Sequence, residues 1–278
     1  MGYLLLAITA SALVSILMRL STDCVKQNVG MLAVNYLTCL VLAAVFALPE
    51  GIFPAHEAVG QTIRMGAVHG ALYLVSFVLL QINVQKNGVV LSATFMKLGL
   101  LVPMAVSVVV FGEKPQLLQI IGFALALGAI LLIHSGKDGG SVRSVLPLLL
   151  LLLGGGAADV MAKVFEELGE SALSDQFLLY TFVFALLLCL YLMARKKQIP
   201  GAPELLWGVL IGIPNFYSAK FLLKALEQLS AVIVYPTYSV ATLLVITMTG
   251  VLFFREKLGR RQWLALGIIL VALTLLNL

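Results

Sequence analysis

The sequence predicts an all-α membrane protein whose ten transmembrane helices form two inverted repeats of five helices. Three observations support this fold class: the composition, the spacing of the apolar segments and an internal duplication. Of the 278 residues, 61% are hydrophobic and 11% are charged, whereas a soluble domain has about 45–50% apolar and about 25% charged residues. With a mean hydropathy of +1.07, the chain has too few polar residues for a water-exposed surface, so the composition predicts a lipid bilayer around it.

Ten apolar segments follow one another along the chain, each near the roughly 20 residues that cross a hydrocarbon core about 30 Å thick. They cover residues 2–20, 30–48, 63–84, 88–111, 116–134, 146–165, 173–194, 204–226, 229–253 and 260–277. Because hydrocarbon offers no partner to backbone N–H and C=O groups, each segment must bond its own backbone as a helix. The first lacks a basic stretch before its apolar run, so we expect a transmembrane helix rather than a signal peptide.

Connections that contain turn-forming or charged residues join consecutive segments, and most of them are short. TDCVKQNVG, QKNG and GEKP follow the first, third and fourth segments, and HSGKDGGSVRS follows the fifth. RKKQIPGAP and REKLGRR follow the seventh and ninth segments, and the longest connection, PEGIFPAHEAVGQTIR, joins the second to the third. None of these is long enough for a soluble domain, so we predict a single integral membrane domain.

The second half of the chain repeats the first. A shift of 143 residues aligns 66–134 with 209–277 without a gap, and 16 of the 69 aligned pairs are identical. The identical polar pairs are Gln85 and Gln228, Thr94 and Thr237, Glu113 and Glu256, Lys114 and Lys257, and Gln119 and Gln262. We therefore predict repeats at 1–138 and 139–278. Five spans per repeat give the halves opposite orientations, which is typical of secondary transporters with a midplane site between the halves.

Several stretches resemble the drug/metabolite transporter superfamily, and within it the EamA branch. They are FGEKPQLLQIIGFALALGAILL, PTYSVATLLVITMTGVLFFREKLGRRQWLALGIIL, the NYL at 35–37 and GIPNFYSAKFLLKAL at 212–226. The resemblance implies a ten-helix transporter whose third and ninth helices line the cavity. It leaves the substrate open, because the superfamily carries amino acids, sugars, nucleotide sugars, choline-like cations, phosphate esters and drugs. One difference is Arg255, which stands where the family usually keeps a glycine before the glutamate.

Lys97 lies near the middle of the segment 88–111, roughly 13–15 Å from its start at 1.5 Å per residue. An ionisable residue at this depth is costly and marks a functional site by default. Thr94 shares its helix face, and the repeat has Val240 at the position of the lysine. Because the twin helix does without this charge, we predict that Lys97 contacts substrate. The alternative is a structural tether to backbone carbonyls or to a carboxylate.

Asp159 and Lys163 are spaced by four residues on one helix, as in an intrahelical ion pair. Such a pair either locks helix packing or exchanges partners during transport, and both interpretations stay open. Arg19 matches Lys163 in the repeat and either joins this coupling set or reaches the lipid headgroups. His69 completes the predicted coupling set, as a proton switch.

Aromatic and polar side chains share helix faces with the remaining candidates. Segment 204–226 carries Lys220, which either lies in the cavity or has a structural role. Segments 63–84 and 229–253 each carry a row of aromatic and polar side chains on one face, which fits either a cavity lining or interhelical packing. The predicted substrate-binding set is Lys97, Lys220, Tyr73, Tyr217, Tyr235, Tyr238, Thr94 and Asn215. No catalytic arrangement and no cofactor or metal motif is present in the sequence, and the three cysteines have no regular spacing, so we expect neither an enzyme nor a metalloprotein.

The intramembrane charges favour a secondary transporter of a small polar metabolite that is anionic or zwitterionic, since Lys97 and Lys220 would repel a lone cation. One alternative is a proton-coupled exporter of drugs or lipophilic cations. Another, of a different class, is a lipid-headgroup flippase or a non-transporting membrane subunit. The expected partners are the substrate, the bilayer and a coupling proton or counter-substrate. Nucleic acid is not an expected partner, because no basic face with interleaved aromatic residues lies outside the apolar spans.

The distribution of basic residues predicts the orientation. Eleven of the 18 Lys and Arg residues lie in the odd-numbered connections and three in the even-numbered ones. By the positive-inside rule both termini then face outward, although better-known members of the resembled family have both termini in the cytoplasm. We expect a multi-pass protein of a bacterial plasma membrane. The duplication already supplies both halves, so a monomer suffices, and a homodimer is also compatible with the sequence.

Overall fold

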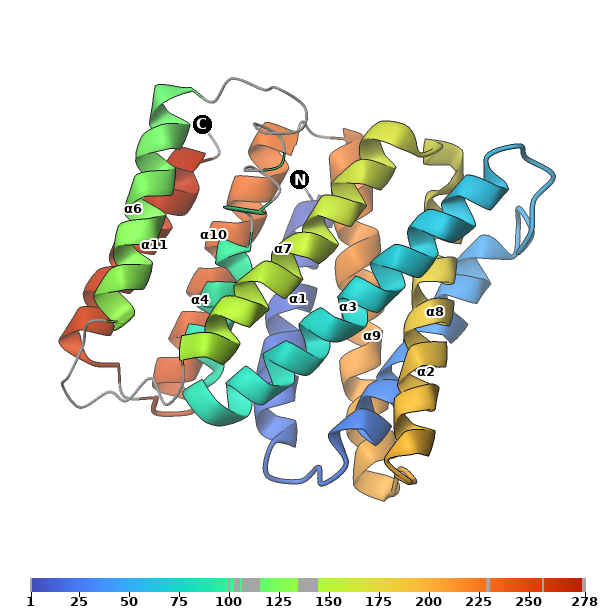
Figure 1. The fold of residues 1–278 in the computed structure, drawn as a ribbon, viewed down its shortest axis with the longest axis horizontal. Coiled ribbons are helices and arrows are strands. Elements are labelled where there is room, and N and C mark those ends of the chain that lie inside the picture. Colours follow the sequence, from blue (N-terminus) through green and yellow to red (C-terminus); the bar gives the residue numbers. More distant parts are fainter. Residues whose placement is uncertain are drawn as a thin grey trace.

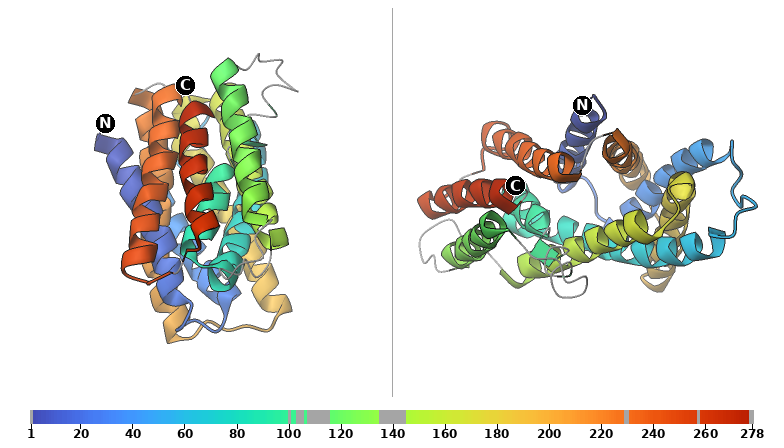
Figure 2. Two further views of the ribbon diagram at one scale, coloured as in Figure 1. Left: turned by 90° about the vertical axis from the view of Figure 1, so that its left-hand side faces the viewer. Right: turned by 90° about the horizontal axis from the view of Figure 1, so that it is seen from above.

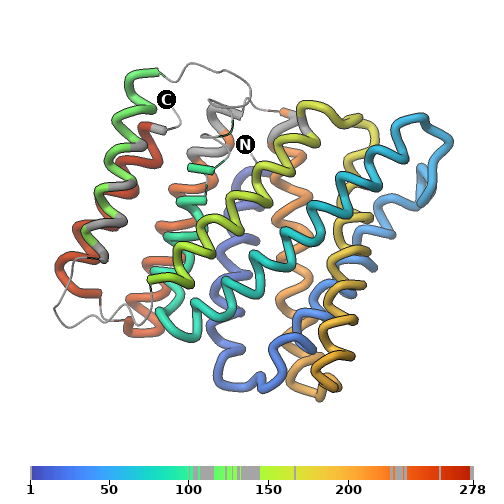
Figure 3. Tube along the Cα trace, viewed as in Figure 1, coloured from blue at the N-terminus to red at the C-terminus, as the bar shows by residue number. Residues whose placement is uncertain are grey.

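A computed structural model describes residues 2–99, 101–102, 106, 116–134, 145–228, 231–256 and 258–276. The regular structure of this part of the chain is helical, without a strand, which confirms the predicted all-α class. The helices are α1 (Gly2–Ser21), α2 (Asn28–Ala47), α3 (Val59–Asn87), α4 (Val89–Leu98), α6 (Leu117–His134), α7 (Val145–Leu168), η1 (Ser171–Leu173), α8 (Ser174–Arg195), α9 (Ala202–Gln228), α10 (Ala231–Leu252) and α11 (Arg260–Leu276). Figure 3 traces the same path, with the remaining residues in grey.

Six helices of the described part are long and apolar enough to cross a membrane: α1, α2, α3, α7, α8 and α9. Shorter apolar helices accompany them, among them Val89–Leu98 and Thr237–Leu252. The predicted boundaries hold to within a few residues, except that α3 begins at Val59 and takes in the end of the long predicted connection. Most of the predicted segment 88–111 beyond α4 lies outside the described residues. The count of ten spans and the inverted repeat stay predictions.

The helices pack in two matching sets. The third helix, α3, packs against α7 and α8, and α9 packs against α1 and α2. A separate pair, α6 and α11, lies side by side at the other end of the molecule (Figure 1). Seen from above, α1, α9 and α10 lie opposite α3 and α7, and α4 contacts both α7 and α10 (Figure 2). Polar side chains on α3, α4, α7, α9 and α10 are therefore brought toward a shared interior.

Glycines allow the closest of these helix contacts. A Cβ built on Gly70 of α3 would collide with the carbonyl oxygen of Thr181 in α8, and one on Gly66 would lie 2.7 Å from Cβ of Tyr180. On α9, a Cβ at Gly212 would lie 2.8 Å from the carbonyl oxygen of Asn35 in α2. Small residues at crossings of this kind let backbones approach and increase van der Waals contact, the main attraction between helices in lipid.

Two glutamates cap helices that are distant in the sequence. Oε1 of Glu204 accepts the backbone N–H groups of Lys26 and Gln27 at the start of α2, at 3.1 Å each. The carboxylate of Glu256 accepts the N–H groups of Val89 and Val90 at the start of α4, at 2.8 and 3.2 Å. The first N–H groups of a helix have no partner inside it, so a carboxylate there satisfies them and complements the helix dipole. The glutamate of the REK turn thus ties α4 to the end of α10.

Candidate substrate site

A glycine contact between α4 and α7 positions the two charged residues of the candidate site. A Cβ on Gly99 would lie 2.8 Å from the backbone nitrogen of Gly156 and 3.0 Å from the carbonyl oxygen of Leu152. Lys97 comes two residues before Gly99, and Asp159 comes three residues after Gly156. Because the backbones meet at this crossing, the ammonium group and the carboxylate reach the same region from two helices.

Lys97 is half-buried, and its Nζ atom lies 3.9 Å from the centre of the Tyr238 ring of α10. An ammonium group at this distance from the face of an aromatic ring is attracted by the ring quadrupole. The positive charge of Lys97 also acts on the carboxylate of Asp159. Within the described residues the two side chains form no ion pair with each other. The Asp159 side chain is exposed at the surface of the described part of the protein. The site thus holds opposite charges that interact without direct contact.

A chain of neutral polar groups adjoins these charges. The Tyr73 hydroxyl of α3 donates a 2.8 Å hydrogen bond to Oδ1 of Asn215 in α9, and Nδ2 of Asn215 donates to Oδ1 of Asn35 at 3.3 Å. The Tyr238 hydroxyl lies 3.2 Å from Oγ of Ser218, also in α9. Tyr73 interacts electrostatically with both Tyr238 and Asp159. We call Lys97, Asp159, Tyr73, Tyr238, Asn215 and Ser218 the central site.

Aromatic rings enclose one side of this cluster. Tyr73 lies 5.1 Å from Phe77, 5.9 Å from Phe182 and 6.4 Å from Tyr36, measured between ring centres. Tyr36 and Phe182 are buried, and rings at these separations pack in tilted or edge-on geometry. The packing fixes the Tyr73 ring, and with it the hydroxyl that meets Asn215.

Two other predicted residues are not among the groups named above, although the His69 ring contacts that of Tyr73 edge-on, with ring centres 5.5 Å apart. His69 is buried, stacks on Phe177 with ring centres 5.1 Å apart, and has Nδ1 3.2 Å from the Thr181 hydroxyl. Thr94 is buried and donates to the carbonyl oxygen of Val90 in its own helix at 2.8 Å. Both side chains are thus engaged in helix packing or local hydrogen bonds.

The remaining coupling candidates lie on α1 and α7. Arg19, near the end of α1, pairs with Asp23 at 3.8 Å and lies over the Phe254 ring. Lys163 is half-buried on α7, one turn after Asp159. The side chain of Tyr235 lies outside the described residues. The structure thus separates Arg19 from the central cluster and keeps Lys163 on its edge.

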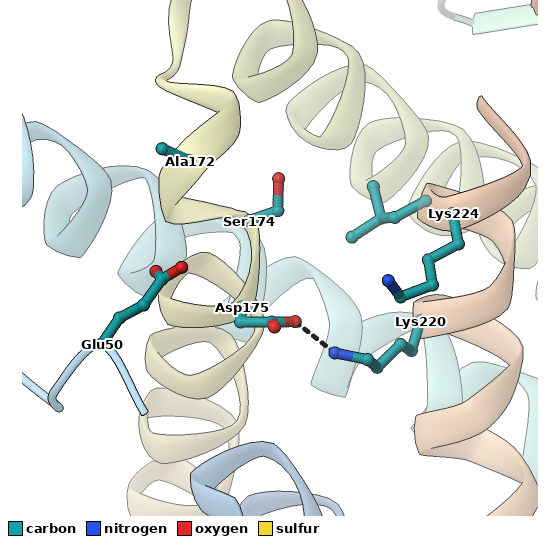
Figure 4. Close-up of a pocket in the computed structure, with 7 residues that line it drawn as sticks. Glu50, Ala172, Ser174, Asp175, Lys220 and Lys224 are labelled. Carbon is teal, nitrogen blue, oxygen red and sulfur yellow. Dashed lines mark hydrogen bonds and ion pairs between the residues drawn. The ribbon is translucent and has the colours of Figure 1, made fainter. Parts of the chain in front are cut away.

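Lys220 and Tyr217 lie at a second place. Nζ of Lys220 is 2.6 Å from Oδ1 of Asp175 at the start of α8 and 3.9 Å from the centre of the Phe46 ring. Tyr217 stacks on Phe221 of its own helix, with ring centres 5.3 Å apart. Figure 4 shows Lys220 and Asp175 pointing toward each other across a pocket. Lys97 and Lys220, predicted together as substrate-binding residues, therefore contact different groups in the structure.

Sequence reasoning missed Asn35, Ser218 and Asp175. Asn35 stands in the NYL motif and Ser218 in the stretch around Asn215, so the motifs contained both residues without indicating their contacts. Asp175 lies in the first turn of α8, where an acidic residue is ordinary helix chemistry. Within the described residues, no group of three or more His, Cys, Asp or Glu side chains could hold a metal ion.

Residues 144–278 match the model of the EamA-like transporter family. The match lies in the second half of the chain. Together with the six long apolar helices of the described part, this similarity supports a multi-pass integral membrane protein. The predicted resemblance to the drug/metabolite transporter superfamily and its EamA branch is thereby confirmed.

Two further similarities extend over nearly the whole chain. A protein of Haemophilus influenzae strain Rd, described as uncharacterized, is 25% identical over 278 residues, which cover 96% of this chain and 94% of that protein. A solved crystal structure, described as that of a protein, aligns with a TM-score of 0.62 and 16% identity, over 99% of this chain and 96% of that chain. The fold is therefore shared along the full length, including the half that precedes the family match.

Proposed function

We propose that this EamA-like protein is a secondary transporter of a small zwitterionic metabolite and works by alternating access of two inverted five-helix halves. The family match supports transport. The observation that carries the substrate class is the placement of Lys97 and Asp159 on either side of the Gly99–Gly156 backbone contact, with no ion pair between them within the described residues.

Opposite charges in a membrane interior are costly unless each has a partner. A zwitterion satisfies both at once, with its carboxylate or phosphate on Lys97 and its ammonium group on Asp159. The Tyr238 ring already holds the Lys97 ammonium group at 3.9 Å, and Asn215 and Ser218 add neutral hydrogen-bonding groups. A simple anion leaves Asp159 unpaired, and a lone lipophilic cation leaves Lys97 unpaired, so the zwitterion fits the charges best.

The packing supports the inverted repeat. Each third helix packs against the first two helices of the other half, as α3 does with α7 and α8 and as α9 does with α1 and α2. The last helices of the two halves, α6 and α11, pack against each other. Both termini lie toward the same end in Figure 1, as an even number of spans requires. With the site between the halves, rocking of one half against the other would expose it alternately to the two sides.

The experiment begins with a thermal-shift screen of the purified protein against amino acids, phosphoamines and simple carboxylates. A ligand at 100 times its Kd adds about 2.7 kcal/mol to the stability of the folded state, which raises the melting temperature. We expect zwitterions to stabilise the protein and their purely anionic analogues to do so much less. Uptake of the hit into proteoliposomes then tests transport.

Two variants test the central charges with that ligand. Lys97→Ala and Asp159→Asn are each expected to lower uptake at least tenfold and to remove the ligand-induced melting shift, while the protein still purifies folded. Lys86→Ala, at the end of α3, is the control for loss of a lysine and should transport normally. Normal uptake by Lys97→Ala would falsify the assigned role of this residue.

A proton-coupled exporter of lipophilic cations is the second candidate, since Asp159 lies in electrostatic contact with Tyr73 and adjoins a ring-rich cluster that suits a cation. This function predicts that an imposed pH gradient drives efflux of a fluorescent lipophilic cation. It also predicts that Lys97→Ala raises this efflux, because the variant removes a repelling charge. The zwitterion carrier predicts a loss in the same variant.

A further inference from the structure

A polar pocket of about 60 Å³ lies where α8 begins and α9 approaches its end, apart from the central site. Its lining consists of Glu50, Ala172, Ser174, Asp175, Lys220, Leu223 and Lys224. Figure 4 shows Glu50 on the wall formed after α2, and Lys220 and Lys224 one turn apart on α9. The volume corresponds to about four to six water molecules at 10–15 Å³ each, which is enough for the charged end of a small metabolite. We call this the α8–α9 pocket.

The Lys220–Asp175 ion pair forms the inner wall of this pocket. The Lys220 side chain is 7% exposed and that of Asp175 is 37% exposed, with 2.6 Å between Nζ and Oδ1. The ring of Phe46 covers the ammonium group from another side, at 3.9 Å. The charge of Lys220 is therefore neutralised in the structure. Loss of its carboxylate partner would leave a buried ammonium group unpaired, which is strongly destabilising.

Within the described residues, two other charged groups of the pocket, Glu50 and Lys224, form no such ion pair. The Glu50 carboxylate accepts a 3.3 Å hydrogen bond from the Gln176 amide, and the nearest described ring to the Lys224 ammonium group is that of Tyr3, at 6.0 Å. The pocket thus offers one carboxylate and one ammonium group on different walls. This is the same complement of charges that Asp159 and Lys97 offer at the central site.

A run of aromatic contacts, which we call the aromatic layer, leads from Lys220 to the central site. Lys220 follows Asn215 on α9 by five residues, or about 7.5 Å along the helix. The Lys220 ammonium group lies over the Phe46 ring, and Phe216 stacks on Phe46 with ring centres 5.6 Å apart. Phe216 lies 6.2 Å from Phe182, which in turn lies 5.9 Å from Tyr73 of the central site.

We propose that the α8–α9 pocket is an outer substrate site, in which Lys224 binds the acidic group of the zwitterion and Glu50 binds its basic group. The Lys220–Asp175 ion pair and the aromatic layer form the closed gate below it. Opening follows when the acidic group of the substrate replaces Asp175 on Lys220, since the exchange of one anion for another keeps Lys220 neutralised. This inference rests on the proposed transport function and adds a second site and a gate to it.

The first experiment measures charge recognition in the pocket with thiol reagents, so it needs no knowledge of the substrate. The background is Cys24→Ser, since Cys24 is exposed whereas Cys39 and Cys189 are buried, and Ser174→Cys supplies the target. An anionic sulfonatoethyl and a cationic trimethylammonium-ethyl thiosulfonate are added on the face of the membrane where the termini lie. Removing a unit charge 4–6 Å away changes such rates about threefold to fivefold in water.

We expect Lys224→Gln to slow the anionic reagent by that factor and Glu50→Gln to slow the cationic one. Lys86→Gln, at the opposite end of the molecule, should change neither rate. Equal rates in all variants would overturn the outer site.

The second experiment measures the gate. Ser218→Cys in the Cys24→Ser background places a thiol in the central site, and the anionic reagent is again added on the side of the termini. We expect slow labelling with the gate intact and labelling at least tenfold faster in Asp175→Asn. The charge exchange Asp175→Lys with Lys220→Asp keeps an ion pair and should restore slow labelling.

Asp23→Asn is the matched control, because it removes the carboxylate partner of another basic side chain, Arg19, away from the pocket. Unchanged labelling in Asp175→Asn would overturn the gate. Both assays run without substrate, so they can fail while Lys97→Ala still abolishes uptake. The converse result, intact uptake in Lys97→Ala with a charge-dependent pocket, would overturn the central site alone.

Discussion

At the scale of the residue, a charge is informative when its neighbours are known. The depth of Lys97, and the valine at the matching position of the repeat, predicted that this lysine is functional. Which face of α7 meets α4 depends on the contact between Gly99 and Gly156, which the sequence did not predict. A helical pattern specifies which residues share a face and leaves the facing helix open. The pairing of Lys97 with Asp159, and of Lys220 with Asp175, therefore required the structure.

The backbone conformation of Arg255 should affect the free energy of unfolding. Its φ is +51°, in the left-handed region that favours glycine, and the resembled family usually keeps a glycine there. We expect Arg255→Gly to raise the free energy of unfolding by ~0.5–1 kcal/mol, since relief of strain outweighs the greater entropy of unfolded glycine. Arg255→Val should lower it. Thermal unfolding in detergent micelles measures both, and a lower melting temperature for the glycine variant would contradict this account.

At the scale of the element, apolar length predicted most helices because lipid imposes one requirement on every span. The described bounds of α2, α8 and α11 agree with the predicted segments to within two residues. The early start of α3 at Val59 was not predictable in the same way, because its first turns carry polar residues such as Gln61 and Arg64. Hydropathy marks the part of a helix that lies in hydrocarbon, and the part beyond it is set by local contacts.

The crossing of α3 and α8 gives a prediction at this scale. A methyl group on Gly70 would collide with the Thr181 carbonyl oxygen, whereas nothing lies within 4 Å of the corresponding position on Gly128 in α6. We expect Gly70→Ala to cost about 1–3 kcal/mol through forced separation of the helices. Gly128→Ala, the matched control, should add about 0.5–1 kcal/mol through helix propensity. Equal melting temperatures for the two variants would show that the crossing adapts freely.

At the scale of the whole molecule, the orientation in the membrane decides which side the α8–α9 pocket opens to. The end of α2 and the start of α8 lie toward the end of the molecule that holds both termini, and the end of α8 lies at the other end (Figure 1). Glu50 and Asp175 belong to the first of these ends, and the basic residues Lys196 and Lys197 to the second. Positive charge is retained in the cytoplasm, by an energy of about 1 kcal/mol per Lys or Arg near an anionic lipid surface. We therefore expect the termini and the pocket to lie outside, where the pocket would receive substrate from the external medium.

Cysteine labelling in intact cells tests this orientation on the Cys24→Ser background. Ala172→Cys, which lies at the pocket, is expected to react with a membrane-impermeant maleimide added outside, and Lys197→Cys is expected to react after the cells are opened. Both positions are exposed at helix ends, so reactivity reports the side of the membrane rather than burial. Labelling of Lys197→Cys from outside would reverse the orientation. The α8–α9 pocket would then open to the cytoplasm and serve as the first site for export, with the same two charges and the same gate.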